Sequence, residues 1–366
     1  MKHIETPRSR SWLAPAAAIA LSAALACTGL AGCSAPAQES TGGDEPAATT
    51  QDAATRTVTD MAGREVEIPA TIDSIATFGS VGVLNAFVEC MGEGDKIVNE
   101  MPANFTKNDK WAMQYKFAPQ LSEGPVLETS DGIDIEATLE LAPDLCITMM
   151  PDMAQQLEEN GLACIVLEWG DTEDVKTAVS LMGEVLSAED RADQYNQYFD
   201  DMVAKAEERT ANLSDDERQR VIYGDVTTLT NPHIISEWWI EAAGGISVTA
   251  EAHTKNSLEY TMEDLLAWQP EVIFSSGSTA EDIAADANFA TIPAVQNGEI
   301  YMVPTVAHVW GNRTVEQPLT VMWAMNKMYP DLYSEDELAE DIKYFYSTFF
   351  EYDMSDEEVD SIINYQ

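Results

Sequence analysis

The sequence predicts an α/β protein with two similarly built lobes, each containing a mostly parallel sheet. Short apolar runs alternate with stretches of helical periodicity, which is typical of strands joined by helices in such a sheet. One pattern also occurs twice: Glu136 and Glu263 each stand seven residues before a proline and an acidic residue, and a short apolar run follows. The copies are about one domain length apart. Each copy therefore predicts a helix, a proline break and a buried strand in its own lobe.

The N-terminus predicts export and lipid attachment. Basic residues precede an apolar, alanine-rich stretch from Trp12 to Leu30, and Leu30-Ala31-Gly32-Cys33 has the small residues of a lipobox. We expect residues 1–32 to be a lipoprotein signal peptide that is removed, with a lipid attached to Cys33. An uncleaved membrane anchor is the alternative, because the apolar stretch is nearly long enough to span a bilayer.

The rest of the chain is expected to have four parts. Residues 33–56 contain no large apolar side chain, so they predict a flexible tether. The fold then starts near Thr57, with an N-terminal lobe over 57–186, a bridging helix over 187–212 and a C-terminal lobe with closing helices over 213–366. The bridging helix is expected because apolar residues from Ala192 to Ala206 recur every three or four positions.

The individual elements follow from these periodicities and from turn residues. In the N-terminal lobe, strands are predicted at 57–59, 65–68, 74–77, 97–98, 145–149 and 164–167, and a helix at 81–91. In the C-terminal lobe, strands are predicted at 221–223, 271–275 and 300–303, and helices at 236–243, 261–268, 315–329, 335–350 and 355–364.

Composition limits the partners. The chain has 64 acidic residues against 19 Lys and Arg, a net charge of −45, which excludes nucleic acid as a partner. Beyond the signal and the lipid site, Cys90, Cys146 and Cys164 form a poor disulfide framework. A bridge between Cys146 and Cys164, in successive predicted strands, is left open. No serine-hydrolase elbow, phosphate-binding glycine loop or His-Glu-x-x-His helix is present, so we expect no enzyme.

The residues resemble the substrate-binding lipoproteins of ABC importers for iron-siderophores, haem and cobalamin. No single stretch is diagnostic, but the order and spacing are specific. The matching stretches are 57–66, 141–145, 241–246, 262–266, 296–301 and the tail around 345–359. One position departs from the family pattern, because Leu84-Asn85-Ala86 replaces the usual small-Thr-Glu run.

The resemblance implies two Rossmann-like lobes with mostly parallel sheets, bridged by one long α-helix, and a shallow cleft between them. It also implies that Glu136 and Glu263 dock on arginines of an ABC-transporter permease dimer, where carboxylate and guanidinium can pair bidentately. The protein would be exported and lipid-anchored to the outer face of the cell membrane. No cofactor is expected apart from the lipid on Cys33.

Ligand contacts are expected where strands end, because ligands of open α/β sheets lie beyond the carboxyl ends of the strands. For the aromatic candidates the alternative is packing in the core, and for Arg313 it is a structural ion pair with Glu316 or a nearby acid. The candidate ligand-binding residues are Phe78, Trp111, Met149, Trp169, Trp238, Trp310 and Arg313.

The expected ligand is a metal chelate: a ferric siderophore first, then haem or cobalamin. Molybdate or tungstate is the alternative, because Arg313 would hold an oxyanion. A receptor for bare zinc or manganese is disfavoured, since it would need His and carboxylate ligands from both lobes. His233, His253 and His308 all belong to the second lobe, so we expect surface or hydrogen-bonded histidines and no metal ligands.

Overall fold

The computed structural model describes residues 54–107, 109–130, 132–168 and 170–365. The chain divides into two compact units, Met1–Gln51 and Asp52–Gln366, and only the second is described below. The predicted signal peptide, Cys33 and nearly all of the tether lie outside the described residues. Within the described ranges, no helix is both long and apolar enough to cross a membrane.

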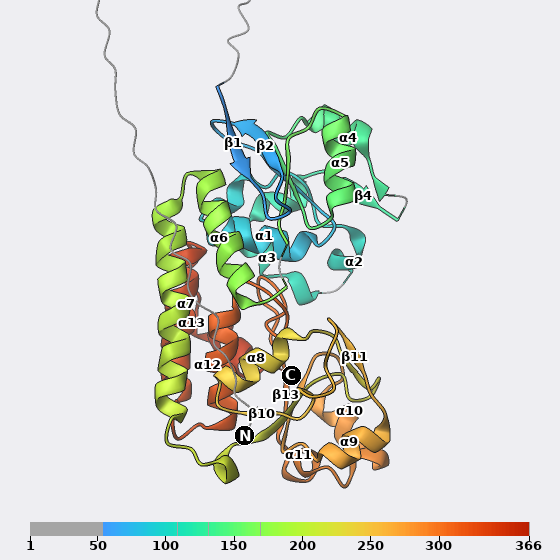
Figure 1. Ribbon diagram of the computed structural model, residues 1–366, viewed down its shortest axis with the longest axis vertical. Coiled ribbons are helices and arrows are strands. Elements are labelled where there is room, and N and C mark those ends of the chain that lie inside the picture. The colour runs from blue at the N-terminus through green and yellow to red at the C-terminus, as the bar shows by residue number, and fades with distance from the viewer. Residues whose placement is uncertain (1–53, 108, 131, 169, 366) are drawn as a thin grey trace, which may run out of the picture. The chain divides into compact units, whose positions relative to one another are not determined.

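The first sheet has three parallel strands in the order β3-β6-β7 (Figure 1). They are β3 (Ile75–Phe78), β6 (Leu145–Thr148) and β7 (Cys164–Val166), and every residue in them is buried. Burial on both faces explains why these strands read as continuous apolar runs. Cys146 lies opposite Cys164 in this register, yet both thiols are free, and burial raises the pKa of Cys146 to about 12.

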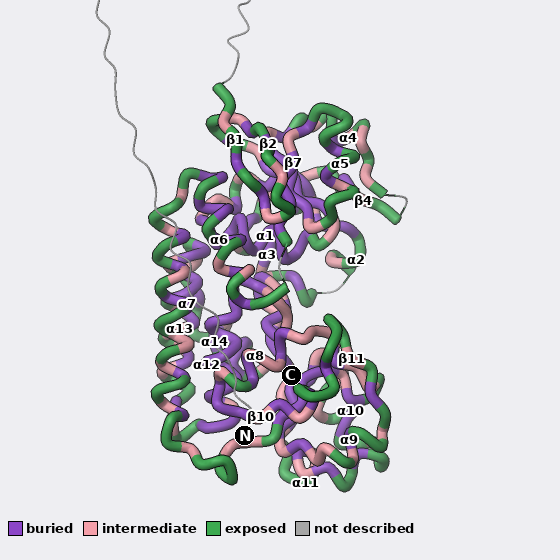
Figure 2. The backbone as a smooth tube through the Cα atoms, viewed as in Figure 1, coloured by how far each residue is buried: buried purple, intermediate pink, exposed green. Residues whose placement is uncertain are grey.

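Helices and a hairpin surround this sheet. Helix α1 (Val81–Cys90) is buried along its whole length, which is visible in Figure 2. The predicted strand at 97–98 is wrong, because only an isolated bridge joins Ile97 to Ile75. The other elements up to the end of α6 are β1 (Thr55–Thr59), β2 (Glu65–Pro69), η1 (Gly94–Lys96), α2 (Ala103–Thr106), η2 (Asp109–Trp111), α3 (Gln114–Phe117), η3 (Pro119–Glu123), β4 (Glu128–Thr129), β5 (Gly132–Ile133), α4 (Ile135–Leu141), α5 (Pro151–Glu159) and α6 (Thr172–Leu186).

The second sheet has four parallel strands in the order β10-β8-β12-β13. These are β10 (Ile246–Ser247), β8 (Arg220–Gly224), β12 (Val272–Ser275) and β13 (Ile300–Met302). The neighbouring elements are η4 (Asp215–Glu217), β9 (Thr230–Asn231), α8 (Ile235–Ala242), β11 (Leu258–Glu259), α9 (Met262–Trp268), α10 (Ala280–Ala285), η5 (Ala287–Phe289) and α11 (Pro293–Asn297). Both sheets are parallel, as the alternation of runs predicts.

The longest helix, α7 (Glu189–Thr210), lies within the predicted range 187–212. Its 22 residues span about 33 Å at 1.5 Å per residue. It packs against α6 and α12 (Gln317–Met328), and Tyr198 places its ring 5.7 Å from Phe345 of α13 (Glu335–Phe349). Figure 1 shows α7 and α13 alongside each other. The chain closes with α14 (Asp356–Ile363).

The repeated sequence pattern is also a repeated structure. Helices α4 and α9 each have seven residues, and each ends at a non-glycine residue with positive φ, Ala142 at 47° and Gln269 at 46°. The proline follows at once in both copies. The acid after it then accepts a backbone N–H at the start of the adjacent strand segment: Asp144 from Ser74 at 3.0 Å, and Glu271 from Arg220 at 2.9 Å. The proline and acid therefore end the helix and secure a neighbouring strand.

Candidate functional site

Two of the predicted contacts lie at strand ends of the first sheet, and a third lies outside the described residues. Phe78 ends β3 and is completely buried, while Met149 follows β6 and is half-buried. The third predicted contact, Trp169, lies outside the residues that the structure describes. The ligand contacts proposed for these side chains stay predictions.

Trp111 joins distant parts of the chain. Its ring lies 5.1 Å from Phe105 and 5.3 Å from the imidazole of His308. The segment around residue 111 therefore contacts the 305–313 loop, which follows the carboxyl end of β13. This loop contains both His308 and Arg313.

The other two tryptophans differ in burial. Trp310 is completely buried, and its Nε1 donates to Glu316 Oε1 at 3.0 Å. Trp238 is half-buried and stacks on Phe199 of α7 at 5.9 Å. It also lines a cavity of about 420 Å³ together with Gly170, Asp171, Thr172, Glu173, Ile234, Ile235 and Glu237.

Among the described residues, Arg313 is not paired with Glu316. Its Nη2 donates to Asn256 Oδ1 at 3.0 Å. Burial lowers the pKa of Arg313, and the nearby Asp174 carboxylate opposes that shift. The guanidinium is thus a partly desolvated charge, the condition in which a pairing anion is held most strongly.

Two histidines have neighbours in this region: the His308 ring lies 5.3 Å from Trp111, and the charge of Arg313 acts on His233. Burial lowers the pKa of His308 to about 3, and the charges of His233 and Lys110 add to the shift. Burial, with Arg313 and His253 close by, lowers the pKa of His233 to about 4. Both imidazoles are therefore neutral at pH 7.

The expectation of surface or hydrogen-bonded histidines stays a prediction for His233 and His308, which are both half-buried, and a backbone hydrogen bond at Val309 acts on the His308 ring. Among the described residues, no hydrogen-bond partner reaches the buried Nδ1 atom of either ring. The expectation fits His253, which is buried with its Nδ1 2.7 Å from Glu237 Oε1. Lys110, His233, His308 and Arg313 together form what we call the basic cluster. The sequence does not point to Lys110, because Lys110 and His308 are far apart along the chain and no motif contains both.

The 305–313 loop is held by a buried carboxylate. Glu316 accepts hydrogen bonds from the backbone N–H groups of Ala307 at 3.0 Å and His308 at 2.7 Å, from Trp310, and from the hydroxyl of Tyr346. A carboxylate with this many donors fixes the backbone on which His308 is mounted.

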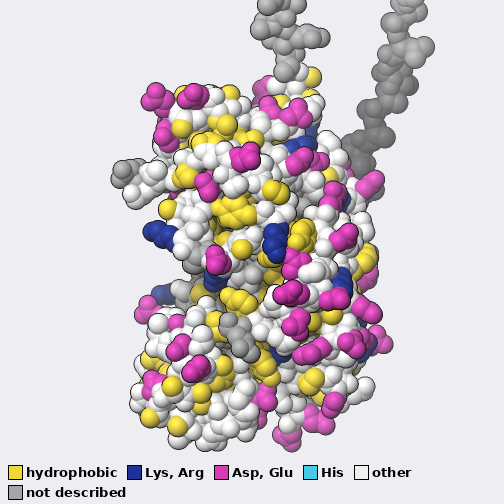
Figure 3. Space-filling model, turned by 180° about the vertical axis from the view of Figure 1, so that it is seen from behind, with side chains coloured by type: hydrophobic (Ala, Val, Ile, Leu, Met, Phe, Trp, Pro, Cys, Tyr) yellow, Lys and Arg dark blue, Asp and Glu magenta, His cyan; other side chains and the backbone are white. Residues whose placement is uncertain are grey.

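Acidic side chains outnumber Lys and Arg in this chain by 64 to 19. On the face seen in Figure 3, acidic side chains are spread widely and basic ones are few. Within the described part of the chain, no group of three or more His, Cys, Asp or Glu side chains has the arrangement to hold a metal ion. The two cations of the cluster, Lys110 and Arg313, are side chains that pair with anions through charge-assisted hydrogen bonds.

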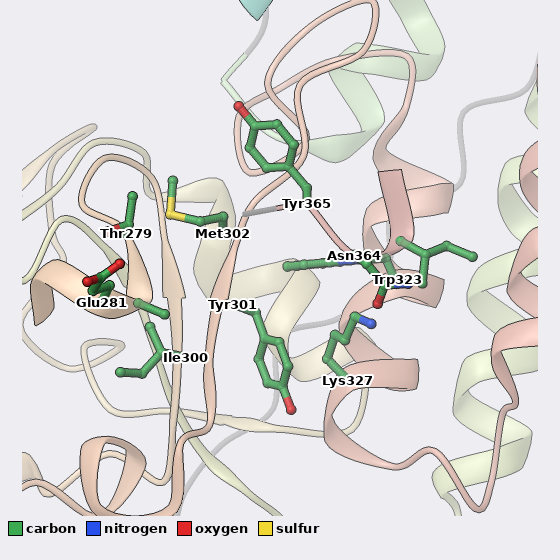
Figure 4. Close-up of a pocket in the computed structure, with 11 residues that line it drawn as sticks. Thr279, Glu281, Ile300, Tyr301, Met302, Trp323, Lys327, Asn364 and Tyr365 are labelled. Carbon is green, nitrogen blue, oxygen red and sulfur yellow. The ribbon is translucent and has the colours of Figure 1, made fainter. Parts of the chain in front are cut away.

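A second cavity, of about 520 Å³, lies between β13, α12 and the chain end after α14 (Figure 4). Its basic side chain, Lys327, already forms an ion pair with Glu335 at 3.5 Å. Tyr301 points toward the same space and donates to Glu299 at 2.6 Å. This cavity contains one cation, which is already ion-paired, whereas the basic cluster contains two, Lys110 and Arg313, so the cavity is the weaker candidate for an anion.

Glu136 and Glu263 are both exposed in the first turn of their helices. Their positions on α4 and α9 are equivalent. Neither carboxylate has a hydrogen-bond or ion-pair partner among the described residues. Both remain available for a partner, and their docking role stays a prediction.

Comparison with known proteins adds relatives at low identity. The chain is 21% identical to the molybdate-binding protein MolA of Haemophilus influenzae, over 81% of this chain and 91% of MolA. It is 22% identical to YvrC, an ABC transporter substrate-binding lipoprotein of Bacillus subtilis, over 85% of this chain and 96% of YvrC.

Solved structures show the same fold. A periplasmic solute binding protein of Veillonella parvula aligns with a TM-score of 0.74 at 24% identity, covering 85% of this chain and 97% of that one. MolA bound to molybdate aligns with a TM-score of 0.70 at 21% identity, covering 82% and 99%. The profile of the family described as periplasmic binding protein matches residues 80–307. The chain therefore belongs to the periplasmic binding protein family, with the class III fold of its helical-backbone receptors.

Proposed function

We propose that this protein is an exported, lipid-anchored receptor that captures a small anionic solute and delivers it to an ABC-transporter permease dimer. In this proposal the two sheets are the cores of two lobes, and α7 bridges them. The family and its substrate-binding relatives support the receptor role. The basic cluster supports the anionic class of ligand.

The convergence of Lys110, His233, His308 and Arg313 is the observation on which the ligand class depends. The charges of Lys110 and His233 act on His308, and the charge of Arg313 acts on His233, in a chain whose net charge is −45. Arg and Lys bind oxyanions through charge-assisted hydrogen bonds, which strengthen when water is excluded. A tetrahedral oxyanion such as molybdate or tungstate is the ligand that this donor set fits best, and MolA supports that choice.

A thermal-shift panel on the purified protein tests the proposal. The panel contains molybdate, tungstate, sulfate, a ferric catecholate, a ferric hydroxamate, haem and cobalamin. A ligand at 100 times its dissociation constant stabilises by about 2.7 kcal/mol, which is easily measured. Stabilisation by no member of the panel would argue against the proposed ligand classes.

Arg313→Ala is the sharper test of the site. We expect it to weaken binding of the stabilising anion by about 1.5 kcal/mol or more, the lower range for a charged hydrogen bond. Arg220→Ala is the matched control, because Arg220 lies at the start of β8 and donates to Trp268 O at 2.7 Å. Equal effects of the two substitutions would assign Arg313 to structure.

The neutral histidines favour a second candidate, a ferric chelate that leaves coordination positions open. A neutral imidazole nitrogen is a good ligand for iron. Both Nδ1 atoms lack a partner in the described residues, and the low pKa values keep both rings unprotonated well below pH 7. The expected result is a shift of the chelate's visible absorption on binding, which His233→Ala and His308→Ala each reduce. An unchanged absorption spectrum would reject the ferric chelate and leave the oxyanion as the proposed ligand.

A further inference from the structure

Buried polar side chains form a continuous series of hydrogen bonds from the first sheet to the 305–313 loop. Thr77 Oγ1 donates to Asn85 Oδ1 at 2.7 Å, and Asn85 Nδ2 donates to Gln114 Oε1 at 3.1 Å. Gln114 Nε2 then donates to the carbonyl oxygen of Ala307 at 2.6 Å. Thr77, Asn85 and Gln114 are all completely buried. Buried polar groups are destabilising unless they are paired, so this series needs its partners.

Gln114 is the branch point of the series. Its Nε2 also donates to the carbonyl oxygen of Gly82 in α1, so two hydrogens of one planar carboxamide reach two backbone carbonyls. Gly82 and Ala307 are distant in sequence. The carboxamide therefore joins α1 to the 305–313 loop through a rigid group.

The residues beside these hydrogen bonds belong to the basic cluster. Gln114 begins α3, shortly after Lys110 and Trp111 of η2, and Ala307 directly precedes His308. The Trp111 ring lies 5.3 Å from His308. The loop is held from its other side by Glu316, which accepts the N–H groups of Ala307 and His308. Ala307 is thus bound at both its N–H and its C=O.

We propose that Gln114 is a positioning residue for the candidate ligand site. Its hydrogen bond to Ala307 holds His308 against Lys110 and Trp111, so that the basic cluster is assembled before a ligand arrives. A preorganised site loses less free energy on binding, because its groups need no further ordering. The effect on ligand affinity rests on the proposed function, whereas the effect on the loop does not.

Gln114→Met tests this, because methionine has a similar length and no hydrogen-bonding amide. We expect hydrogen exchange at the amides of Ala307 and His308 to become about tenfold faster as the loop opens locally. Molybdate affinity should fall about tenfold, which corresponds to about 1.4 kcal/mol. If Gln114→Met does not fold, Gln114→Glu keeps the side-chain shape and serves for the same two measurements.

Gln120→Met is the matched control. Gln120 Nε2 also donates to two backbone carbonyls, of Gly94 at 2.6 Å and Ile97 at 3.2 Å, but neither belongs to the 305–313 loop. This control should leave exchange at Ala307 and His308 at the wild-type rate. It should also leave molybdate affinity unchanged.

The outcomes separate the two proposals. Unchanged exchange at Ala307 and His308 in Gln114→Met, or an equal change in Gln120→Met, overturns the positioning role. Faster exchange with unchanged molybdate affinity overturns it as well. Faster exchange in a protein whose wild type binds no molybdate supports the link from Gln114 to the loop and rejects molybdate as the ligand.

Discussion

Glu89 and Glu316 are both buried carboxyl groups, but their surroundings differ. Glu316 accepts several hydrogen bonds, whereas neither oxygen of Glu89 has a partner among the described residues. Burial raises the pKa of Glu89 well above its ordinary value, and the Glu316 charge adds to the shift. Glu89 is therefore a neutral acid inside the protein.

A raised pKa makes stability fall as pH rises. Above about pH 4.5 the unfolded chain releases the Glu89 proton while the folded protein keeps it, so the folded state loses up to about 1.4 kcal/mol per pH unit. Glu89→Gln removes this linkage. We expect the variant to become progressively more stable than wild type as the pH rises from about 4.5 toward the raised pKa of Glu89, measured by denaturant unfolding. The exposed Glu140 supplies a control, Glu140→Gln, whose difference from wild type should stay constant. A pH-independent difference for Glu89→Gln would contradict the interpretation.

At the scale of elements, helices α4 and α9 have the same length, and each is followed by a residue in the left-handed conformation. In both copies the acidic residue after the proline accepts a hydrogen bond from the backbone of a neighbouring strand segment. Asp134 and Thr261 cap their first turns by accepting from the backbone at the third position. Such capping leaves Glu136 and Glu263 free of a structural task. This is why a docking role for them does not conflict with the stability of either helix.

The docking role is tested by Glu136→Gln and Glu263→Gln. Each keeps the size of the side chain and removes the charge that makes a contact with arginine strong. We expect ligand affinity to be unchanged and uptake by the permease to fall about tenfold for each single variant, the equivalent of one charged hydrogen bond. The double variant should have almost no uptake. Glu140→Gln on α4 and Glu281→Gln on α10 are exposed controls. Normal uptake by the double variant would return both glutamates to ordinary helix-start residues.

At the scale of the whole molecule, the net charge of −45 produces repulsion that opposes compactness. Salt screens this repulsion, since the Debye length falls from about 30 Å at 0.01 M to about 3 Å at 1 M. We expect the melting temperature at pH 7 to rise with NaCl over this range. At pH 4, where many carboxylates are protonated, the rise should be much smaller. A melting temperature that falls with salt at pH 7 would mean that ion pairs outweigh the net repulsion.

Location is a second property of the whole chain. If Cys33 is the lipid site, Cys33→Ser should shift the protein from the membrane fraction to the soluble fraction, as judged by fractionation and immunoblotting. Cys90→Ser is the control, because Cys90 is buried in α1. Retention of Cys33→Ser in the membrane would favour an uncleaved anchor.

The sequence by itself determined the α/β class, both parallel sheets and the repeated helix, proline and strand. These features depend on neighbouring residues: continuous apolar runs predict buried strands, and a proline ends the helix before it. The same local reasoning failed at residues 97–98. There an apolar pair makes only one bridge, because forming a strand depends on a partner strand as well as on composition.

Only the tertiary structure decided the composition of the basic cluster. Arg313 is a candidate from the sequence, because a lone cation after a strand is visible there. His233 and His308 are not, since the burial of Nδ1 and the absence of a partner for it depend on residues far along the chain. Lys110 has no signal in the sequence, and Asn85 is marked only by the departure of Leu84-Asn85-Ala86 from the family pattern. Lys110 comes close to His308, and Asn85 reaches Ala307 through Gln114, by contacts between segments nearly two hundred residues apart, and no local pattern records such contacts.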